Sequence, residues 1–210
     1  MTIKFRHLVF FIFFALPITG FGESLSELVQ RDGRFYAKFS DIPFSGQITG
    51  KTQGTIEEGL KNGFWRYFRE DGQLWKKGSY KNGKQTGVWS FFNDSNLLYQ
   101  SEYLNGELHG KSFSFWKNGQ IGFEANYEKG KKTGLYREFR ENGLIVHESH
   151  WANGMRHGMY TQYSDTGELW SKGRYKNGRR EGRWIDYWID GELDKKMSGI
   201  YEDDKKIGDL

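Results

Sequence analysis

The sequence contains no cysteine and only 2 prolines. Without cysteine the chain has no disulfide bond, no thiolate metal ligand and no cysteine for a lipid anchor. Because proline is so scarce beside 28 glycines, we expect the glycines to serve turns and not a disordered linker rich in both residues. Aromatic residues make up 18% of the chain, which is too many for a disordered protein. We therefore expect a folded chain that depends on its own packing.

The sequence also lacks a strong excess of charge of one sign. Lysine and arginine number 31 against 27 aspartates and glutamates, and the two signs are interspersed. Nucleic-acid-binding proteins usually carry a basic stripe, so we expect no nucleic acid partner. No polybasic block is present either, so charge does not support binding to a membrane surface, although it leaves that partner open.

The first residues carry a hydrophobic run that is too short to span a membrane comfortably. Lys4 and Arg6 precede the apolar segment "LVFFIFFAL" (8–16), and small residues follow as far as Gly22. This order is typical of a secretory signal peptide. We predict a signal peptide over residues 1–22, cleaved after Gly22, and an exported protein that is periplasmic or secreted. The alternative is an uncleaved N-terminal anchor.

The rest of the sequence repeats itself. Similar segments open on a glycine at positions 63, 87, 110, 134, 158 and 182, at spacings of 23 or 24 residues. A fixed period between about 20 and 50 residues indicates a repeat array. We therefore predict a six-unit array over residues 63–210.

The units share one internal order: an aromatic residue two positions after the glycine in five of the six units and five positions after it in all six, then a turn, Leu or Ile, another aromatic residue, and a second turn. We expect these positions to form the repeat core: Trp65, Phe68, Leu74, Tyr80, Trp89, Phe92, Tyr103, Phe115, Tyr127, Phe139, Trp151, Tyr163, Tyr175, Trp184 and Tyr187.

The turns are mostly Asn-Gly and Asp-Gly, which is a strong hairpin signal because these residues tolerate positive φ. Two turns in 24 residues leave two strands of ordinary length. The sequence thus predicts an all-β fold, an elongated antiparallel meander of about six stacked β-hairpins. Leu74, Lys76, Gly78 and Tyr80 alternate, so a regular strand would place them on one face.

Two features of the pattern leave alternatives open. The third position of each second strand is always small, which leaves room for a ring of a neighbouring strand or provides the floor of a ligand groove. The aromatic residues at plus two and plus five differ in parity, so either they face opposite sides or a bulge separates them.

The segments before the array are less regular. We expect residues 34–62 to form degenerate capping hairpins, because terminal units of arrays usually deviate. Residues 23–33 are predicted to be a leader that is either a short helix or disordered.

The frame "G-x-W-x-x-F-x-x-D-G-Q-L-x-x-x-G-x-Y-K-N-G-K", which begins at Gly63, resembles the MORN-repeat variant of bacterial proteins labelled as YwqK-family antitoxins. The resemblance extends over residues 46–208. It implies a β-hairpin array that binds proteins or lipids, and the label implies a toxin that is bound and blocked. The predicted signal peptide would place this chain outside the cytoplasm, where it would not meet a cytoplasmic toxin. The family has no shared catalytic residues.

Catalytic and metal-binding patterns are missing from the sequence. There is no nucleophile elbow and no phosphate-binding loop. His109 and His157 occupy equivalent positions two units apart, about 19 Å at the usual strand spacing, which is too far to share one metal. We therefore expect no enzyme activity, no catalytic residue, no metal and no cofactor.

Several aromatic residues lie outside the strictly repeated positions. Such rings either cap the open face of the sheet or contact a partner, since aromatic rings stack on sugars and anchor protein interfaces. The candidate partner-binding residues are Trp75, Tyr99, Trp116, Trp170 and Trp188. The predicted function is an exported, non-enzymatic scaffold for protein–protein interaction. The alternatives are an antitoxin or immunity protein and a module that binds cell-envelope glycans.

Overall fold

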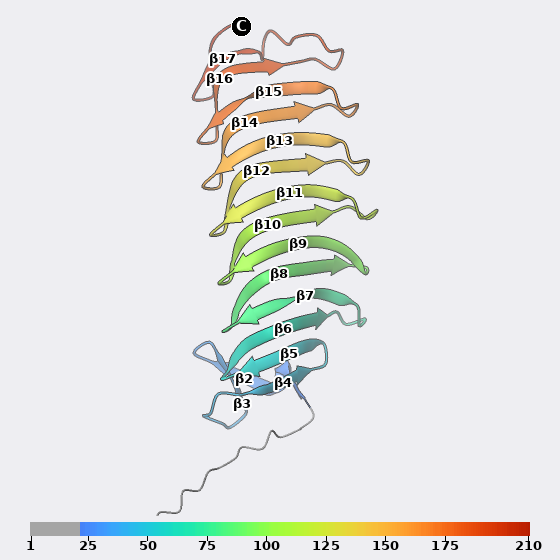
Figure 1. The fold of residues 1–210 in the computed structure, drawn as a ribbon, viewed down its shortest axis with the longest axis vertical. Helices are drawn as coiled ribbons and strands as arrows, with labels where there is room; N and C mark the ends of the chain where they lie inside the picture. The colour runs from blue at the N-terminus through green and yellow to red at the C-terminus, as the bar shows by residue number, and fades with distance from the viewer. Residues whose placement is uncertain (1–21) are drawn as a thin grey trace, which may run out of the picture.

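The computed structural model describes residues 22–210, and it confirms the predicted all-β meander. Sixteen strands form one long sheet in which neighbours in the sequence are neighbours in space (Figure 1). The predicted signal peptide, apart from Gly22, lies outside the described residues. Within residues 22–210, no helix has the length and apolar character needed to cross a membrane.

The sheet begins with a short parallel pair and continues as antiparallel hairpins. β1 pairs in parallel with β4, and a separate two-stranded sheet consists of β2 and β3. The elements in chain order are β1 (Glu23–Ser24), a 3₁₀ helix (Leu25–Glu27), β2 (Leu28–Arg31), β3 (Arg34–Ala37), β4 (Gly46–Thr49), β5 (Thr52–Glu57), β6 (Leu60–Phe68), β7 (Leu74–Lys81), β8 (Lys84–Asn93), β9 (Asn96–Leu104), β10 (Glu107–Phe115), β11 (Ile121–Glu128), β12 (Lys131–Phe139), β13 (Ile145–Ala152), β14 (Met155–Tyr163), β15 (Leu169–Lys176), β16 (Arg179–Asp186), β17 (Gly199–Glu202) and β18 (Lys205–Gly208).

The tight turns have the geometry that their sequences predict. Asn82 and Gly83 both have positive φ, 50° and 76°, as a two-residue hairpin turn of right-handed twist requires. The turns are also bonded to one another along the edge of the sheet. The Gly83 amide donates to the Lys61 carbonyl at 2.9 Å, and Gly106 donates in the same way to Gln85. Each turn therefore fixes the backbone of the strand one unit earlier.

The opening glycines lie inside strands and not between them. β6 runs through Gly63, whose φ is +67°, and residues 63–65 together oppose the single residue Gly54 of β5. This is a bulge, and the glycine at each unit start provides the positive φ that it needs. The predicted unit boundaries thus mark a bulge, and each strand pair begins three residues earlier, at the tight turn.

A second bulge changes one predicted face. Tyr67 pairs with Lys76 and Phe68 pairs with Leu74, so Trp75 is an extra residue on β7. Because Tyr67 and Phe68 are consecutive, their side chains point to opposite faces. Their partners, Lys76 and Leu74, therefore also point to opposite faces. The expectation that Leu74 shares a face with Lys76, Gly78 and Tyr80 was therefore wrong for Leu74. The aromatic residues at plus two and plus five face opposite sides.

The small residues of the second strands make room for rings, which decides between the two alternatives that the sequence left open. A methyl group built on Gly78 would lie 2.3 Å from the Trp89 ring, and one on Gly173 would lie 2.2 Å from Trp184. These tryptophans are fully buried, although the sheet has a single layer. Each ring lies flat against the backbone of the preceding strand, which shields it from water.

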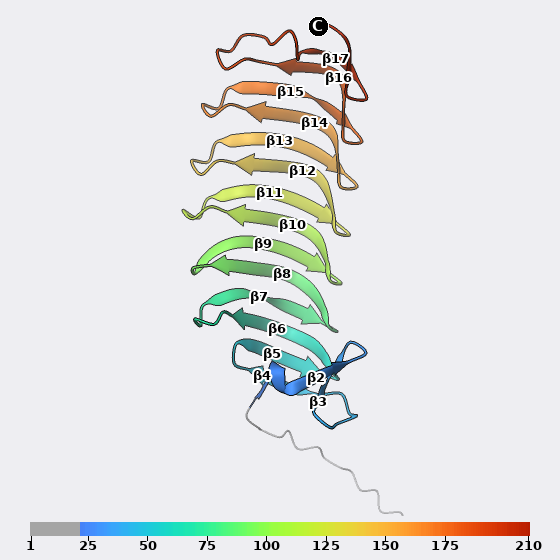
Figure 2. The same cartoon turned by 180° about the vertical axis from the view of Figure 1, so that it is seen from behind.

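The N-terminal cap includes part of the segment predicted to be a short helix or a disordered leader. Residues 23–31 form β1, one 3₁₀ turn and β2, so the expectation of disorder was wrong there. Leu28 is buried against Ile48, Ile56 and Trp65, because the first unit has no preceding unit to cover its apolar side chains. These contacts are distant in sequence, and they place the β2–β3 hairpin at the N-terminal end of the sheet (Figure 2).

Candidate binding face

One face of the sheet carries a row of aromatic rings, and we call it the aromatic face. It is defined by the residues two and four positions after each opening glycine, by the residues of the second strands that pair with them, and by the residues that pair with the opening glycine itself, such as Tyr80 and Tyr175. The rings lie within stacking or edge contact of one another. Tyr80 and Trp89 are 5.0 Å apart between ring centroids, Phe123 and Tyr136 are 5.9 Å apart, and Tyr175 and Trp184 are 5.0 Å apart.

The row has a buried layer and a partly exposed layer. Trp65, Trp89 and Trp184 have no exposed surface, whereas rings such as Tyr67, Phe91 and Phe123 are half-buried. The third unit interrupts the row, because its plus-two residue is Ser112, whose hydroxyl bonds the hydroxyl of Ser101 at 2.7 Å. The buried layer of the face therefore has a polar gap in the third unit, whereas the exposed layer continues across it through Tyr99 and Phe123, which both pair with Ser114.

Basic side chains lie over these rings at a recurring position, two residues before the opening glycine. The Lys61 ammonium is 4.6 Å from the Trp65 ring centroid, Lys132 is 4.0 Å from Tyr136, and the Arg180 guanidinium is 4.3 Å from Trp184. Arg156 lies over Tyr160 at 5.4 Å. Such contacts between a cation and an aromatic face are favourable, more so where water is excluded.

Burial among the rings shifts the ionisation of several groups on this face. It lowers the pKa of Lys61 to about 8, with the nearby charge of Lys76 as a second cause. Burial likewise raises the pKa of Tyr67 and of Tyr136. The His147 ring stacks between Tyr136 and Tyr160, and its burial lowers its pKa although Glu138 acts in the opposite direction.

The structure brings four of the five candidate partner-binding residues to the aromatic face. The Trp75 ring lies 4.4 Å from the Lys76 ammonium, which also lies 4.6 Å from the Tyr67 ring. The Tyr99 ring packs against the Phe123 ring, with 6.2 Å between the ring centroids. All five candidates have between 41% and 55% of their surface exposed, so they are available to a partner.

Trp170 and Trp188 line one groove at the C-terminal end of this face. The groove has a volume of about 1020 Å³, and its walls include Gln162, Asp186 and Met197. The loop between β16 and β17 forms one wall, and it replaces the regular hairpin expected for the last unit. The Ser171 hydroxyl donates to the Asp186 carboxylate at 2.6 Å, and Arg180 lies 3.6 Å from its other oxygen.

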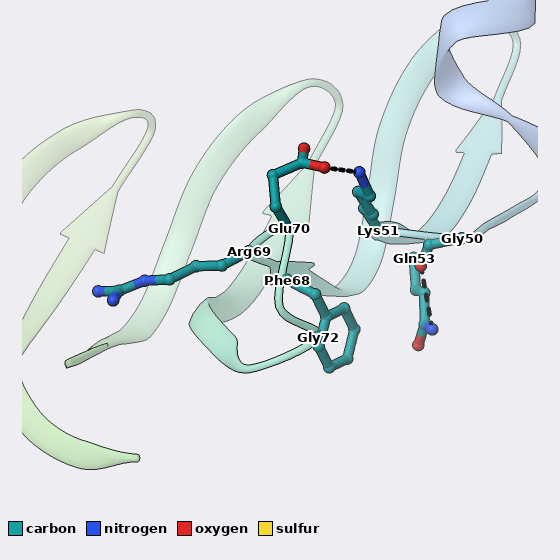
Figure 3. A pocket seen from close by; sticks show the side chains of 7 residues that line it. All are labelled: Gly50, Lys51, Gln53, Phe68, Arg69, Glu70 and Gly72. Carbon is teal, nitrogen blue, oxygen red and sulfur yellow. Dashed lines mark hydrogen bonds and ion pairs between the residues drawn. The ribbon is translucent and has the colours of Figure 1, made fainter. Parts of the chain in front are cut away.

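The fifth candidate, Trp116, lies in a long turn at the edge of the sheet. Its indole nitrogen donates to the Phe139 carbonyl of the next unit at 3.0 Å. The same edge has a small hollow of about 340 Å³ in the first unit, between the β4–β5 and β6–β7 turns. Figure 3 shows Lys51 and Glu70 paired across its rim, with Arg69 pointing away toward the next unit. There Arg69 donates to the Phe92 carbonyl at 3.1 Å.

Sequence reasoning missed the basic residues of the aromatic face. The signal was present, because the residue two positions before the opening glycine is basic in four of the six units, namely Lys61, Lys132, Arg156 and Arg180. In the part of the chain that the structure describes, no cluster of His, Asp or Glu side chains has the arrangement of a metal site.

Three segments of the chain match the family model described as "MORN repeat variant": residues 61–82, 108–129 and 156–177. Each match begins at the position two residues before an opening glycine, and each ends in a tight turn. The matched segments therefore coincide with three of the six units, the first, the third and the fifth. No curated protein matches the chain.

Among solved structures, the chain is similar to part of S. aureus TarM. One match is a substituted form in complex with fondaparinux, alpha-GlcNAc-glycerol and UDP, at 18% identity and a TM-score of 0.33, covering 45% of this chain. A second match, also titled TarM, has 21% identity and a TM-score of 0.33, and it covers 48% of this chain. The chain spans 19% and 20% of the lengths of those two chains.

Proposed function

We propose that this protein is a non-catalytic scaffold that binds a protein partner along its aromatic face. The observation that carries the proposal is the row of half-buried rings with cations above them, which runs along one side of a single-layer sheet. Burying such rings in an interface would remove apolar surface from water, which is the main driving force of association. The MORN-variant segments support a binding role of this kind.

The composition of the face favours a protein as the partner. Protein interfaces derive most of their affinity from a few Trp, Tyr and Arg residues that are shielded from water in the complex. The aromatic face presents Trp75, Tyr99 and Trp170 together with Arg156 and Arg180. Because the rings recur along the array, a partner can contact several units at once.

Two narrower functions remain as variants of this proposal. In the first, the partner is a toxin that the array blocks, as the family label suggests. In the second, the C-terminal groove holds a glycan, because Trp170 and Trp188 lie there beside the polar groups of Gln162 and Asp186. Sedimentation with purified peptidoglycan separates the glycan variant from the others. Export from the cytoplasm stays a proposal that rests on the first 22 residues.

Site-specific photo-crosslinking in the cells that make the protein tests the main proposal. A photoreactive phenylalanine analogue would replace Trp75, Tyr99 or Trp170 on the aromatic face. Phe64, Val88 and Met159 serve as matched controls, because they lie one residue after an opening glycine, on the opposite face, with similar exposure. We expect one common protein adduct from the aromatic face and none from the controls. Adducts of equal yield from both faces, or from neither, would contradict the proposal.

A further inference from the structure

Two of the later units, the fourth and the sixth, supply their own carboxylates to the cations of the aromatic face, whereas the equivalent residue of the fifth unit is Gln162. In the fourth unit the residue four positions after the glycine is Glu138, whose carboxylate lies 3.5 Å from the His147 imidazole and favours the charged form of Lys132. In the sixth unit the equivalent residue is Asp186, 3.6 Å from the Arg180 guanidinium. A partly buried cation is more stable beside such a counter-charge.

The first unit has the cations without the carboxylate. Its residue at the equivalent position is Tyr67, and two lysines converge on this side chain. The Lys61 ammonium donates to the Tyr67 hydroxyl at 3.0 Å, and that hydroxyl donates to the Tyr80 hydroxyl at 3.1 Å. The Lys76 ammonium lies 4.6 Å from the centre of the same ring.

Neither ammonium has a carboxylate partner. The ion pairs among residues 22–210 involve neither Lys61 nor Lys76. Residues 1–21 contain no Asp or Glu that could pair with them. The other groups around Lys61 are the rings of Phe35, Trp65 and Tyr80, which carry no formal charge. Two ammonium groups therefore lie against one tyrosine, in a partly buried site whose other neighbours are uncharged aromatic rings.

We infer that the carboxylate of an Asp or Glu side chain on a partner polypeptide binds between Lys61 and Lys76. It would take the place that Glu138 and Asp186 hold in the fourth and sixth units, so these two units indicate a chemical group that satisfies this position. The rings of Tyr67 and Trp75 flank the site, and they would contact the apolar part of the acidic side chain. This inference rests on the proposed function, because it assigns one contact within the same aromatic face.

The ionisation of Lys61 gives the site a measurable pH dependence. Its pKa is lowered to about 8 by burial and by Lys76, and a bound carboxylate would favour the ammonium and raise this pKa. Since only the charged form attracts the carboxylate, binding should weaken as the pH rises through about 8. The titratable groups that face Lys61 are Lys76, Tyr67 and Tyr80. Burial lowers the pKa of Lys76, so its loss of charge weakens binding in the same direction, whereas burial raises the pKa of Tyr67.

The test uses residues 23–210 or the full chain with hexaglutamate as the probe and hexaglutamine as the neutral control, followed by NMR of the lysine side chains. We expect hexaglutamate to shift the signals of Lys61 and Lys76 and to raise the pKa of Lys61. The double variant Lys61→Met with Lys76→Met should lose about tenfold in affinity. The control variant Lys77→Met with Lys172→Met removes two lysines from the other face and should leave the affinity unchanged. Circular dichroism would confirm that both variants are folded.

Three outcomes would overturn the inference. An equal loss of hexaglutamate affinity in the two double variants would mean that binding depends on net charge alone. Unchanged lysine signals would mean that no carboxylate binds here. Tighter binding of inorganic phosphate than of hexaglutamate, lost in the Lys61 and Lys76 variant, would assign the site to a phosphate-bearing ligand. If one of these outcomes is found while cellular crosslinks from Tyr99 and Trp170 persist in that variant, this contact fails and the proposed function survives.

Discussion

The ring two positions after each opening glycine lies against a residue eleven positions earlier, and the sizes of the two are matched. Tryptophan stands against glycine in three pairs: Gly54 with Trp65, Gly78 with Trp89, and Gly173 with Trp184. Tyrosine stands against alanine or serine, in Ala125 with Tyr136 and Ser149 with Tyr160. Where the ring is absent, Ser101 meets Ser112. Close packing of a single-layer sheet explains this match, because a larger ring needs a smaller residue beneath it.

A double-substitution cycle tests the match at one pair. Gly78→Ala would place a methyl group 2.3 Å from the Trp89 ring, so we expect a loss of about 1–3 kcal/mol in the free energy of unfolding. Adding Trp89→Tyr should recover about 1 kcal/mol or more, because it recreates the combination of the fourth unit. Urea denaturation measures both changes.

The neighbouring Gly87 supplies the control. Its φ is +64° and nothing lies near its missing methyl group, so Gly87→Ala should cost about 1 kcal/mol through backbone strain alone. Trp89→Tyr should not recover that loss. Additive effects for Gly78→Ala and Trp89→Tyr would show that the ring and the glycine are not coupled.

At this scale, the sequence indicated the rings and the small residues, since both recur with the repeat. It did not indicate which cations lie over rings or which lack a carboxylate. Lys61 and Lys76 look like ordinary surface lysines among 31 basic residues. Only the register of β6 against β7 brings them to the same tyrosine.

The β-hairpin is the repeated structural element of this protein, and the local sequence encodes its tight turn. Four of the tight turns have an Asn of positive φ followed by Gly, namely those of Asn82, Asn105, Asn153 and Asn177. Such dipeptides predict hairpins without knowledge of the rest of the fold. The bulges could not be predicted in the same way. A bulge depends on the register between two strands, that is, on how many residues of one strand lie opposite each residue of the other. For that reason the face of Leu74 was predicted wrongly although its strand was predicted correctly.

One of the turns without asparagine gives a prediction for the element. Lys129 has a φ of 49° in the position that asparagine holds in four equivalent turns. Asparagine tolerates this conformation better than lysine, so Lys129→Asn should raise the free energy of unfolding by about 0.5–1 kcal/mol. The reverse change, Asn153→Lys, should lower it by a similar amount.

The charge lost in Lys129→Asn needs its own control. Lys131 is exposed on the adjacent strand, and its backbone is not in the left-handed region. Lys131→Asn therefore removes the same charge without relieving a turn and should not stabilise the protein. If Lys131→Asn and Lys129→Asn stabilise equally, charge and not turn geometry is responsible.

Across the whole molecule, stability depends on contacts between neighbouring units. Each strand of the main array pairs only with the strands before and after it, so no contact links the first unit to the last. In such an array, stability is approximately the sum of unit terms and of neighbour interfaces. The ends need separate protection, which the β2–β3 hairpin gives to Ile48 and Ile56. The period in the sequence predicted the array, whereas the cap depends on contacts that no local pattern encodes.

This organisation predicts that whole units can be removed. Deleting residues 134–157 joins Thr133 to Gly158 and preserves every turn, bulge and strand direction. It also sets Ala125 against Tyr160, a combination that matches Ala125 with Tyr136. We expect this variant to fold with a lower urea m-value, because less surface is exposed on unfolding. Deleting only residues 134–145 would reverse the direction of every later strand and should prevent folding.

A second deletion of equal length distinguishes the effect of chain length from that of the fit between a ring and the residue beneath it at the new junction. Deleting residues 158–181 joins His157 to Gly182 and sets Ser149 against Trp184, a larger ring than the native Tyr160. Because the serine side chain would occupy the space that the tryptophan needs, this variant should be less stable than the first by about 1–3 kcal/mol. Ser149→Gly in the same variant should remove most of that difference. If the two deletions are equally stable, or if Ser149→Gly has no effect, the fit between a ring and the residue beneath it does not govern how neighbouring units join.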